Sequence, residues 1–300
     1  IVNQINKLND KYSNEGYRLI AVAYKKINSI KNDSNSLENE LIFLGLVTLL
    51  DPPKQSAHEA IERLKNLGIE TKILTGDNEL VTKKIAQEIK INNKGVILGT
   101  QIEEMDQKAL EEAVEKNTIF AKLLPDHKKR IVEALRKKHV VGFLGDGIND
   151  APSLRASDVG ISVDGGVDVA KESADIILLE TNLKILADGV IEGRKIFANL
   201  LKYLRMGASS NFGNMFSVLG ASIFLPFLPM KPIQILTNNL LYDISQLSIP
   251  FDNVDKDYIQ KPRRWNIDDI RRFIIYIGPV SSIFDYVTYF VMLFVFNSWQ

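Results

Sequence analysis

Short apolar runs alternate with amphipathic stretches over the first 205 residues of the chain. Apolar runs of strand length, separated by segments of helical period, predict an α/β domain with parallel strands. The segments expected to be strands are Ile42–Thr48, Glu70–Leu74, Gly95–Leu98, Thr118–Ala121, Val140–Leu144, Val159–Val163 and Asp175–Leu179. Helices are expected at Ser56–Leu67 and Asp126–Lys138, where apolar residues recur on one face.

The N-terminal 40 residues have a different pattern. The apolar run Arg18–Ala23 predicts a strand, and the polar segment Asn28–Asn39 predicts a surface loop. We therefore expect residues 1 to about 40 to form a separate piece from the α/β domain.

Charge divides the chain at about residue 205. Residues 206–300 hold 14 charged side chains in 95 positions, whereas the first 205 residues hold 60. A bilayer crossing needs about 20 mostly apolar residues. Three stretches reach that length, Met206–Leu228, Pro232–Phe251 and Phe273–Phe296, and their aromatic and basic flanks favour membrane spans over soluble core helices.

Basic residues lie before the first stretch and between the second and the third. Lys and Arg favour the cytoplasmic side of a membrane, so we expect both groups, and residues 1–205, to be cytoplasmic. The two groups are Arg194, Lys195, Lys202 and Arg205, and Lys256, Lys261, Arg263, Arg264, Arg271 and Arg272. The turn Pro229–Pro232 is then external, and the chain is a multi-pass protein in contact with the lipid bilayer.

Composition excludes several classes of protein. Lys+Arg and Asp+Glu both total 37, so no general basic character points to a nucleic-acid partner. The sequence has no cysteine, which excludes a disulfide framework, a zinc–thiolate site and a cysteine nucleophile.

The sharpest local motif runs from Gly145 to Leu154 and directly follows the expected strand Val140–Leu144. Asp146 and Asp150 are placed on a Gly-rich turn at the carboxyl end of a parallel strand. Mg²⁺ is typically bound by one or two carboxylates together with phosphate oxygens. Both aspartates are therefore candidate metal ligands; a bare Gly-Asp-Gly turn would be the alternative.

Two further strand ends carry groups suited to phosphate. Thr75-Gly76-Asp77 follows the strand Glu70–Leu74 and opens a helix near Asn78, where a hydroxyl and free backbone amides suit a phosphate. Lys128 begins another helix and is suited to neutralising a transferring phosphoryl group. By themselves, Thr75 and Asp77 could be ordinary helix caps, and Lys128 could be a solvated surface lysine. Together the groups form a phosphoryl-transfer constellation that lacks a nucleophile.

The ordered motifs resemble those of P-type cation-transporting ATPases. They are Asp51-Pro52-Pro53-Lys54, Thr75-Gly76-Asp77, Pro125-Asp126-His127-Lys128 and Gly145–Leu154, and the resemblance covers essentially all 300 residues. It implies a haloacid-dehalogenase-like phosphorylation domain, a parallel sheet flanked by helices, followed by an α-helical transmembrane region. It also implies ATP and Mg²⁺ as cofactors, and transport driven through an aspartyl phosphate.

The resemblance divides the chain and assigns roles. It implies that residues 1–45 end a nucleotide-binding domain, 46–190 are the second half of the phosphorylation domain, and 191–300 include the fifth to seventh transmembrane helices. The implied catalytic residues are Thr75, Gly76, Asp77, Lys128 and Asn149, and the implied hinge is Asp51, Pro52 and Pro53. The family phosphorylates an Asp in an Asp-Lys-Thr-Gly-Thr motif, and no Asp-Lys-Thr occurs in this sequence. We therefore expect a piece of a longer pump that is inactive alone.

Polar residues in the charge-poor part suggest an ion path. Asn239, Asp243 and Gln246 recur on one helical stripe, and a carboxylate within a span usually faces the bundle interior. Ser210, Asn211 and Asn214 add oxygen ligands on the first stretch. Asp243 could instead only hold helices together by a hydrogen bond, and for Asp285 that structural alternative is stronger.

The resemblance places Asn211, Asn214, Asn239 and Asp243 at the family's ion-site positions. Calcium pumps of the family have a Glu where this chain has Asn214, so the site is less anionic. The strings 239–252 and 278–285 look like bacterial magnesium-importing pumps of the plasma membrane, which makes Mg²⁺ the expected transported cation. Two alternatives stay open: a membrane-anchored phosphatase of the same fold, and a non-catalytic truncated membrane protein.

Overall fold

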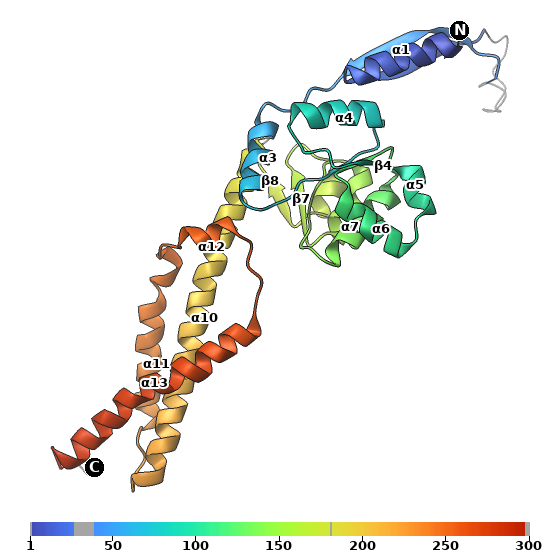
Figure 1. The fold of residues 1–300 in the computed structure, drawn as a ribbon. Helices are drawn as coiled ribbons and strands as arrows, with labels where there is room; N and C mark the ends of the chain where they lie inside the picture. Colours follow the sequence, from blue (N-terminus) through green and yellow to red (C-terminus); the bar gives the residue numbers. More distant parts are fainter. Residues whose placement is uncertain (1, 27–38, 181, 298–300) are drawn as a thin grey trace. The chain divides into compact units, whose positions relative to one another are not determined.

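A computed structural model describes residues 2–26, 39–180 and 182–297 of the chain (Figure 1). The chain divides into two compact units, Ile1–Ala187 and Asp188–Gln300. The first unit holds all the described strands, and the second is entirely helical in its regular structure.

The first unit begins with a helix and a two-stranded sheet. Helix α1 (Val2–Asn14) is followed by β1 (Tyr17–Tyr24), and β1 pairs antiparallel with β2 (Ile42–Leu50). The turn between α1 and β1 contains Gly16 at φ +93°, a backbone conformation that glycine adopts without strain. The strand expected at Arg18–Ala23 is thus confirmed, whereas the segment expected to be a loop at 28–39 lies, except for its last residue, outside the described residues.

The expectation that Ile42–Thr48 belongs to the parallel sheet is wrong. The segment is a strand, but its partner is β1, in a sheet of its own. An apolar run predicts a strand and says nothing about which strand it pairs with.

The other six expected strands are confirmed, Val159–Val163 with the expected bounds and five with shorter bounds, and all their pairings are parallel. They form two three-stranded sheets, ordered β3-β5-β4 and β6-β7-β8, instead of one continuous sheet. Their bounds are β3 (Ile73–Leu74), β4 (Val96–Leu98), β5 (Ile119–Ala121), β6 (Gly142–Leu144), β7 (Val159–Val163) and β8 (Ile176–Leu178).

Helices separate these strands, as in other parallel α/β folds. They are α3 (Ser56–Asn66), α4 (Glu79–Glu88), α5 (Gly99–Glu104), α6 (Gln107–Lys116), α7 (Pro125–Arg136), α8 (Ala151–Ala156) and α9 (Asp168–Glu172), with a 3₁₀ turn η1 (Ile148–Asp150). The expected helices Ser56–Leu67 and Asp126–Lys138 correspond to α3 and α7.

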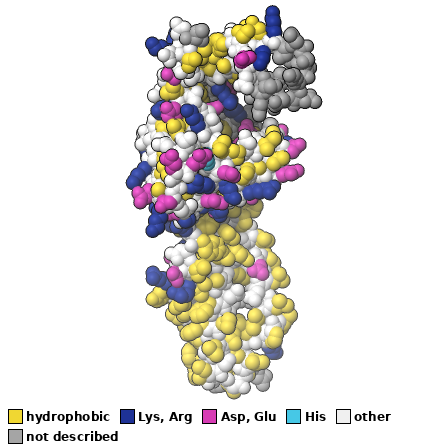
Figure 2. Space-filling model, turned by 90° about the vertical axis from the view of Figure 1, so that its right-hand side faces the viewer, with side chains coloured by type: hydrophobic (Ala, Val, Ile, Leu, Met, Phe, Trp, Pro, Cys, Tyr) yellow, Lys and Arg dark blue, Asp and Glu magenta, His cyan; other side chains and the backbone are white. Residues whose placement is uncertain are grey.

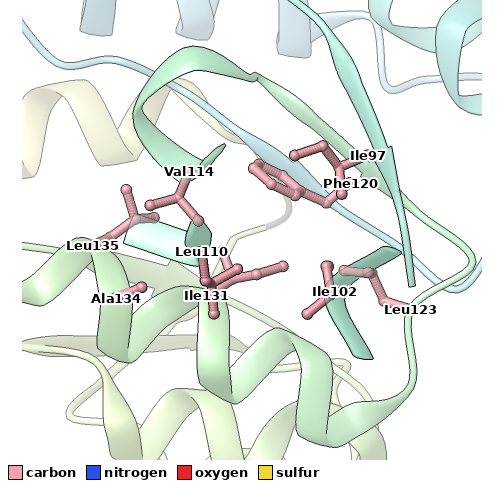
Figure 3. Packing of buried hydrophobic residues seen from close by; sticks show 9 residues of the cluster. All are labelled: Ile97, Ile102, Leu110, Val114, Phe120, Leu123, Ile131, Ala134 and Leu135. Carbon is pink, nitrogen blue, oxygen red and sulfur yellow. The ribbon is translucent and has the colours of Figure 1, made fainter. Parts of the chain in front are cut away.

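Two buried clusters connect the sheets. One joins Phe120 of β5 to Ile131 of α7 and Leu110 of α6, all fully buried (Figure 3). The other contains Phe143 of β6, and Leu74 at the end of β3 packs against both clusters. This shared packing places the carboxyl ends of β3 and β6 next to each other.

Asp158, just before β7, ties α7 to the start of β6. Its carboxylate accepts hydrogen bonds from the Val141 amide at 2.9 Å and from Arg136 Nε at 2.9 Å. Burial raises the pKa of Asp158, but these two donors outweigh it and hold the pKa below its ordinary value.

The second unit consists of α10 (Lys184–Phe224), which begins in the first, and α11 (Pro232–Gln246), η2 (Ile249–Phe251), α12 (Lys256–Gln260) and α13 (Ile267–Phe294). The three expected spans fall on α10, α11 and α13 with different ends. Helix α10 ends at Phe224, two residues before Pro226, because the residue before a proline disfavours helical geometry.

One described helix, α13, is long and apolar enough to cross a membrane. Only 17% of its most apolar window is buried, which is unlike the core helix of a soluble protein. Helix α11 has 15 residues and spans about 22 Å, short of the roughly 30 Å hydrocarbon core. The spans expected on α10 and α11 therefore stay predictions.

Large apolar side chains are exposed on the second unit (Figure 2). Examples are Ile223 of α10 at 85%, Leu236 of α11 at 65% and Phe284 of α13 at 72% exposure. Apolar patches of this extent are normally covered by lipid or by further protein.

Small residues allow α10 and α13 to pack closely. A side chain on Gly213 would meet the Gly278 carbonyl oxygen at 2.7 Å, and Ser282 donates a hydrogen bond to the Gly213 carbonyl at 2.9 Å. Ser217 donates to Asp285 Oδ2 at 2.6 Å. Close backbone approach with interhelical hydrogen bonds is typical of helix pairs in membranes, and Asp285 takes part in this pairing.

Candidate functional site

The Thr75–Asp77 turn connects β3 to α4. Thr75 Oγ1 accepts a hydrogen bond from the Asp77 amide at 3.1 Å and donates one to Asp77 Oδ2 at 3.2 Å. The next residue, Asn78, caps α4 by accepting from the Val81 amide at 2.9 Å, as expected for a helix that begins there. The hydroxyl is therefore held in one orientation by its own loop, with Gly76 exposed beside it.

Lys128 and Asp150, 22 residues apart, form an ion pair. Lys128 Nζ lies 2.7 Å from Asp150 Oδ1, and the two side chains are only 14% and 12% exposed. The other oxygen, Oδ2, accepts from the Gly147 amide at 3.2 Å. Lys128 is consequently not a freely solvated lysine, and both oxygens of Asp150 already have a donor.

Asp146 and Asn149 lie in the same turn, and both are exposed. The turn is tight at Gly145, where a Cβ atom would stand 2.5 Å from the Cβ of Asp150. Glycine is required here because the backbone passes against the buried carboxylate. Asp146 is thus the carboxylate of this turn that faces outward with no charged partner in the described part of the chain.

The few carboxylates in this turn suit Mg²⁺, which can take its other ligands from phosphate and water, better than a cation that is bound wholly by protein groups. No group of three or more His, Cys, Asp or Glu that could hold a metal occurs among the described residues. Mg²⁺ needs only one or two carboxylates when phosphate and water supply the remaining oxygens. Asp146 fits that role, because it is exposed and has no charged partner among the described residues. Asp150 instead has both oxygens bonded, to Lys128 and to the Gly147 amide, so its expected role as a metal ligand stays a prediction.

The structure brings part of this candidate phosphate site together. The turns after β3 and β6 adjoin, because Leu74, next to Thr75, packs against the buried cluster that contains Phe143, three residues before Asp146. The expected hinge, Asp51, Pro52 and Pro53, has no regular structure and connects β2 to α3, as a hinge would. Its motion is not tested by this geometry and stays a prediction.

A polar cavity of about 150 Å³ lies between α10 and α11 in the second unit. It is lined by Tyr203, Gly207, Asn211, Asn239, Tyr242, Asp243 and Gln246. Three of the four residues assigned to the transported-ion site, Asn211, Asn239 and Asp243, thus share one cavity. Asp243 and Asn211 are exposed, within a unit whose surface is otherwise largely apolar (Figure 2).

The fourth residue, Asn214, does not line this cavity. Asn211 and Asn214 are three positions apart, which rotates their side chains by about 60° around the helix axis. Sequence reasoning also missed Tyr203, Gly207 and Tyr242, whose only signal was their place within about two helical turns of Asn211 or Asp243.

Two protein families match the chain. Residues 12–158 match the haloacid dehalogenase-like hydrolases, and residues 227–300 match the C-terminal region of cation transporting ATPases. With the relatives described next, these matches show that the chain belongs to the P-type cation-transporting ATPases.

Among these relatives, magnesium-transporting ATPases are more similar than calcium-transporting ones. The chain is 52% identical over 300 residues to "Magnesium-transporting ATPase, P-type 1" of Salmonella typhimurium and of Escherichia coli, covering 99% of the chain and 33% of each relative. It is 37% identical over 267 residues to "Calcium-transporting ATPase 1" of Bacillus cereus, covering 87% of the chain and 30% of the relative. The chain thus spans about a third of the length of the curated relatives it matches.

Proposed function

We propose that the chain is the part of a magnesium-transporting P-type ATPase that handles the phosphoryl group and binds the cation. The observation that carries this proposal is the cavity of Asn211, Asn239 and Asp243 within a largely apolar helical unit. A carboxylate in such surroundings is costly and marks an ion path by default. A membrane-anchored phosphatase would have no use for this cavity, so the transport function is favoured.

The first unit would stabilise a phosphoryl group without attacking it. Thr75 and the backbone beside Gly76 bind phosphate oxygens, Lys128 neutralises charge, and Asp146 holds Mg²⁺ with Asn149 nearby. Bound there, Mg²⁺ would screen the negative charge of the phosphate. The attacking carboxylate must come from outside these 300 residues, so ATP hydrolysis through an aspartyl phosphate belongs to the complete protein.

The second unit would bind the transported cation in the plasma membrane. One carboxylate with several amides offers few anionic oxygens, which suits Mg²⁺ that keeps some of its waters better than Ca²⁺, which takes six to eight oxygen ligands. The 52% identity to magnesium-transporting relatives supports the same ion. Residues 1–205 would be cytoplasmic, where ATP is available, and three spans would cross the bilayer.

The phosphoryl part of this proposal is tested in the complete protein by labelling with γ-³²P-ATP. Asp146→Ala should abolish the phosphoenzyme because it removes the proposed metal ligand, and Lys128→Ala should leave slow turnover. The matched control is Asp168→Ala, since Asp168 is an aspartate of the same unit that is 90% exposed. Normal phosphoenzyme levels in Asp146→Ala would contradict the proposed metal role.

A further inference from the structure

Gln246 is the last residue of α11 and is buried at 5% exposure. Neither its amide nitrogen nor its amide oxygen makes a hydrogen bond within the described part of the chain. The Tyr242 hydroxyl is within reach of the amide but not in hydrogen-bonding geometry. Gln246 is thus a buried polar side chain with no satisfied group.

Such a side chain is costly to keep. A buried donor or acceptor without a partner carries its full desolvation penalty, whereas an apolar side chain of the same shape would carry none. Native proteins leave few polar groups in this state, and each one requires an explanation. A ligand that occupies the adjacent space would supply the missing partner.

The adjacent space is the cavity between α10 and α11, which Gln246 lines. At about 30 Å³ for each water, a cavity of 150 Å³ has room for about five waters, or for a cation with part of its hydration shell. Gln246 follows Asp243 by three positions and Asn239 by seven, so all three lie on one stripe of α11. Its buried amide therefore faces the same space as the proposed cation ligands.

We propose that Gln246 is a further cation-binding residue, whose amide oxygen contacts the transported ion or one of its waters. This inference rests on the proposed function and extends it by one neutral oxygen ligand. Because the amide is uncharged, Asp243 remains the one negative charge among the described residues that line the cavity. A single negative charge favours a small dication that keeps water over Ca²⁺, which is bound by more carboxylate oxygens.

The test uses the complete protein in cells that lack other magnesium uptake systems. External Mg²⁺ is varied while internal Mg²⁺ and ATP stay constant, and both the half-saturating concentration and the maximal uptake rate are measured. Gln246→Leu should raise the half-saturating concentration about tenfold or more, because about tenfold is the lower end of the contribution of one hydrogen bond to a charged group. The matched control is Asn238→Leu, which removes an amide of α11 that lines a different cavity and should change nothing.

A second variant keeps the oxygen and adds charge. Gln246→Glu should retain Mg²⁺ uptake and make it more sensitive to inhibition by added Ca²⁺, because a second carboxylate suits the larger ion. Unchanged Ca²⁺ sensitivity in this variant would overturn the inference, whether or not Gln246→Leu folds.

Melting temperatures of the purified variants separate binding from packing. If Gln246 is only a poorly packed amide, Gln246→Leu should raise the melting temperature and keep the half-saturating concentration of the parent, and the inference is then wrong. Asp243→Asn separates the inference from the proposed function. Undiminished uptake by the Asp243→Asn variant would contradict the proposed cation site itself. Lost uptake by Asp243→Asn, together with unchanged uptake by Gln246→Leu, would contradict only the role of Gln246.

Discussion

Replacing Lys128 with methionine tests whether its ion pair with Asp150 stabilises the candidate phosphate site. Lys128→Met keeps most of the side-chain volume and removes the ammonium group, whose Nζ lies 2.7 Å from Asp150 Oδ1. At an effective dielectric constant of about 20, the Coulomb attraction across that distance is about 6 kcal/mol, and desolvation of both charges offsets much of it. Without Lys128, the carboxylate keeps the Gly147 amide as its remaining described donor.

Removing one partner of a buried pair typically costs 3–5 kcal/mol. Because these side chains are still 14% and 12% exposed, we expect the lower end, about 3 kcal/mol. The loss is measured as the fall in unfolding free energy of the purified protein. Asp150→Asn added to Lys128→Met should recover part of the loss, since the double variant no longer leaves a buried charge unpaired.

The control is Lys116→Met, which breaks the exposed pair between Lys116 and Glu112. Those side chains are 74% and 72% exposed, so the change should cost less than about 1 kcal/mol. An equal effect of Lys128→Met and Lys116→Met would refute the reasoning, because burial would then have contributed nothing to the Lys128 pair.

Three further predictions concern the backbone turn, the helix pair and acid stability. Gly145→Ala should lower the free energy of unfolding by about 1–3 kcal/mol, because the added Cβ clashes with the buried side chain of Asp150. Gly147→Ala should lower the melting temperature less, because its Cβ would lie 3.4 Å from the nearest atom, Asp150 Oδ2. Gly213→Ala should lower the melting temperature by separating α10 from α13, whereas Gly193→Ala, with nothing within 4 Å, should raise stability by about 0.5–1 kcal/mol. Asp158→Asn should destabilise the protein at neutral pH. Urea titrations should show this deficit shrinking as the pH falls below about 4, where Asp158 of the unfolded chain gains a proton, and disappearing below the lowered pKa of the folded carboxylate. A deficit that stays constant on acidification would contradict the role assigned to the charge of Asp158.

The parallel strands could be predicted because each is a short apolar run between helical segments. The partner of Ile42–Leu50 could not, because an apolar run is equally compatible with an antiparallel neighbour. The length of α10, 41 residues without interruption, was also not predicted. Its N-terminal part carries many charges, and hydropathy alone predicts only the apolar portion.

The candidate site, like the fold, could be predicted only in part. Each motif and its strand end could be recognised in the sequence, but the pairing of Lys128 with Asp150 joins residues that have no periodic relation. The residues of α11 that line the cavity could be predicted, because Asn239, Asp243 and Gln246 lie on one helical stripe. Which residues of α10 line the cavity could not, because this depends on how α10 is rotated about its axis relative to α11. The observed rotation leaves Asn214 outside the lining of the cavity and brings Tyr203 into it, which no pattern along a single helix could show.

The central claim is that Asp243 binds the cation that phosphorylation drives across the membrane. It is tested most directly by ATP-dependent Mg²⁺ transport of the complete protein in proteoliposomes, with phosphoenzyme formation measured on the same preparation. Asp243→Asn removes the one charge among the described residues that line the cavity, and it should end transport while the phosphoenzyme still forms. Undiminished Mg²⁺ transport by Asp243→Asn would contradict the account, because the ion path would then run elsewhere and Asp243 would only hold helices together.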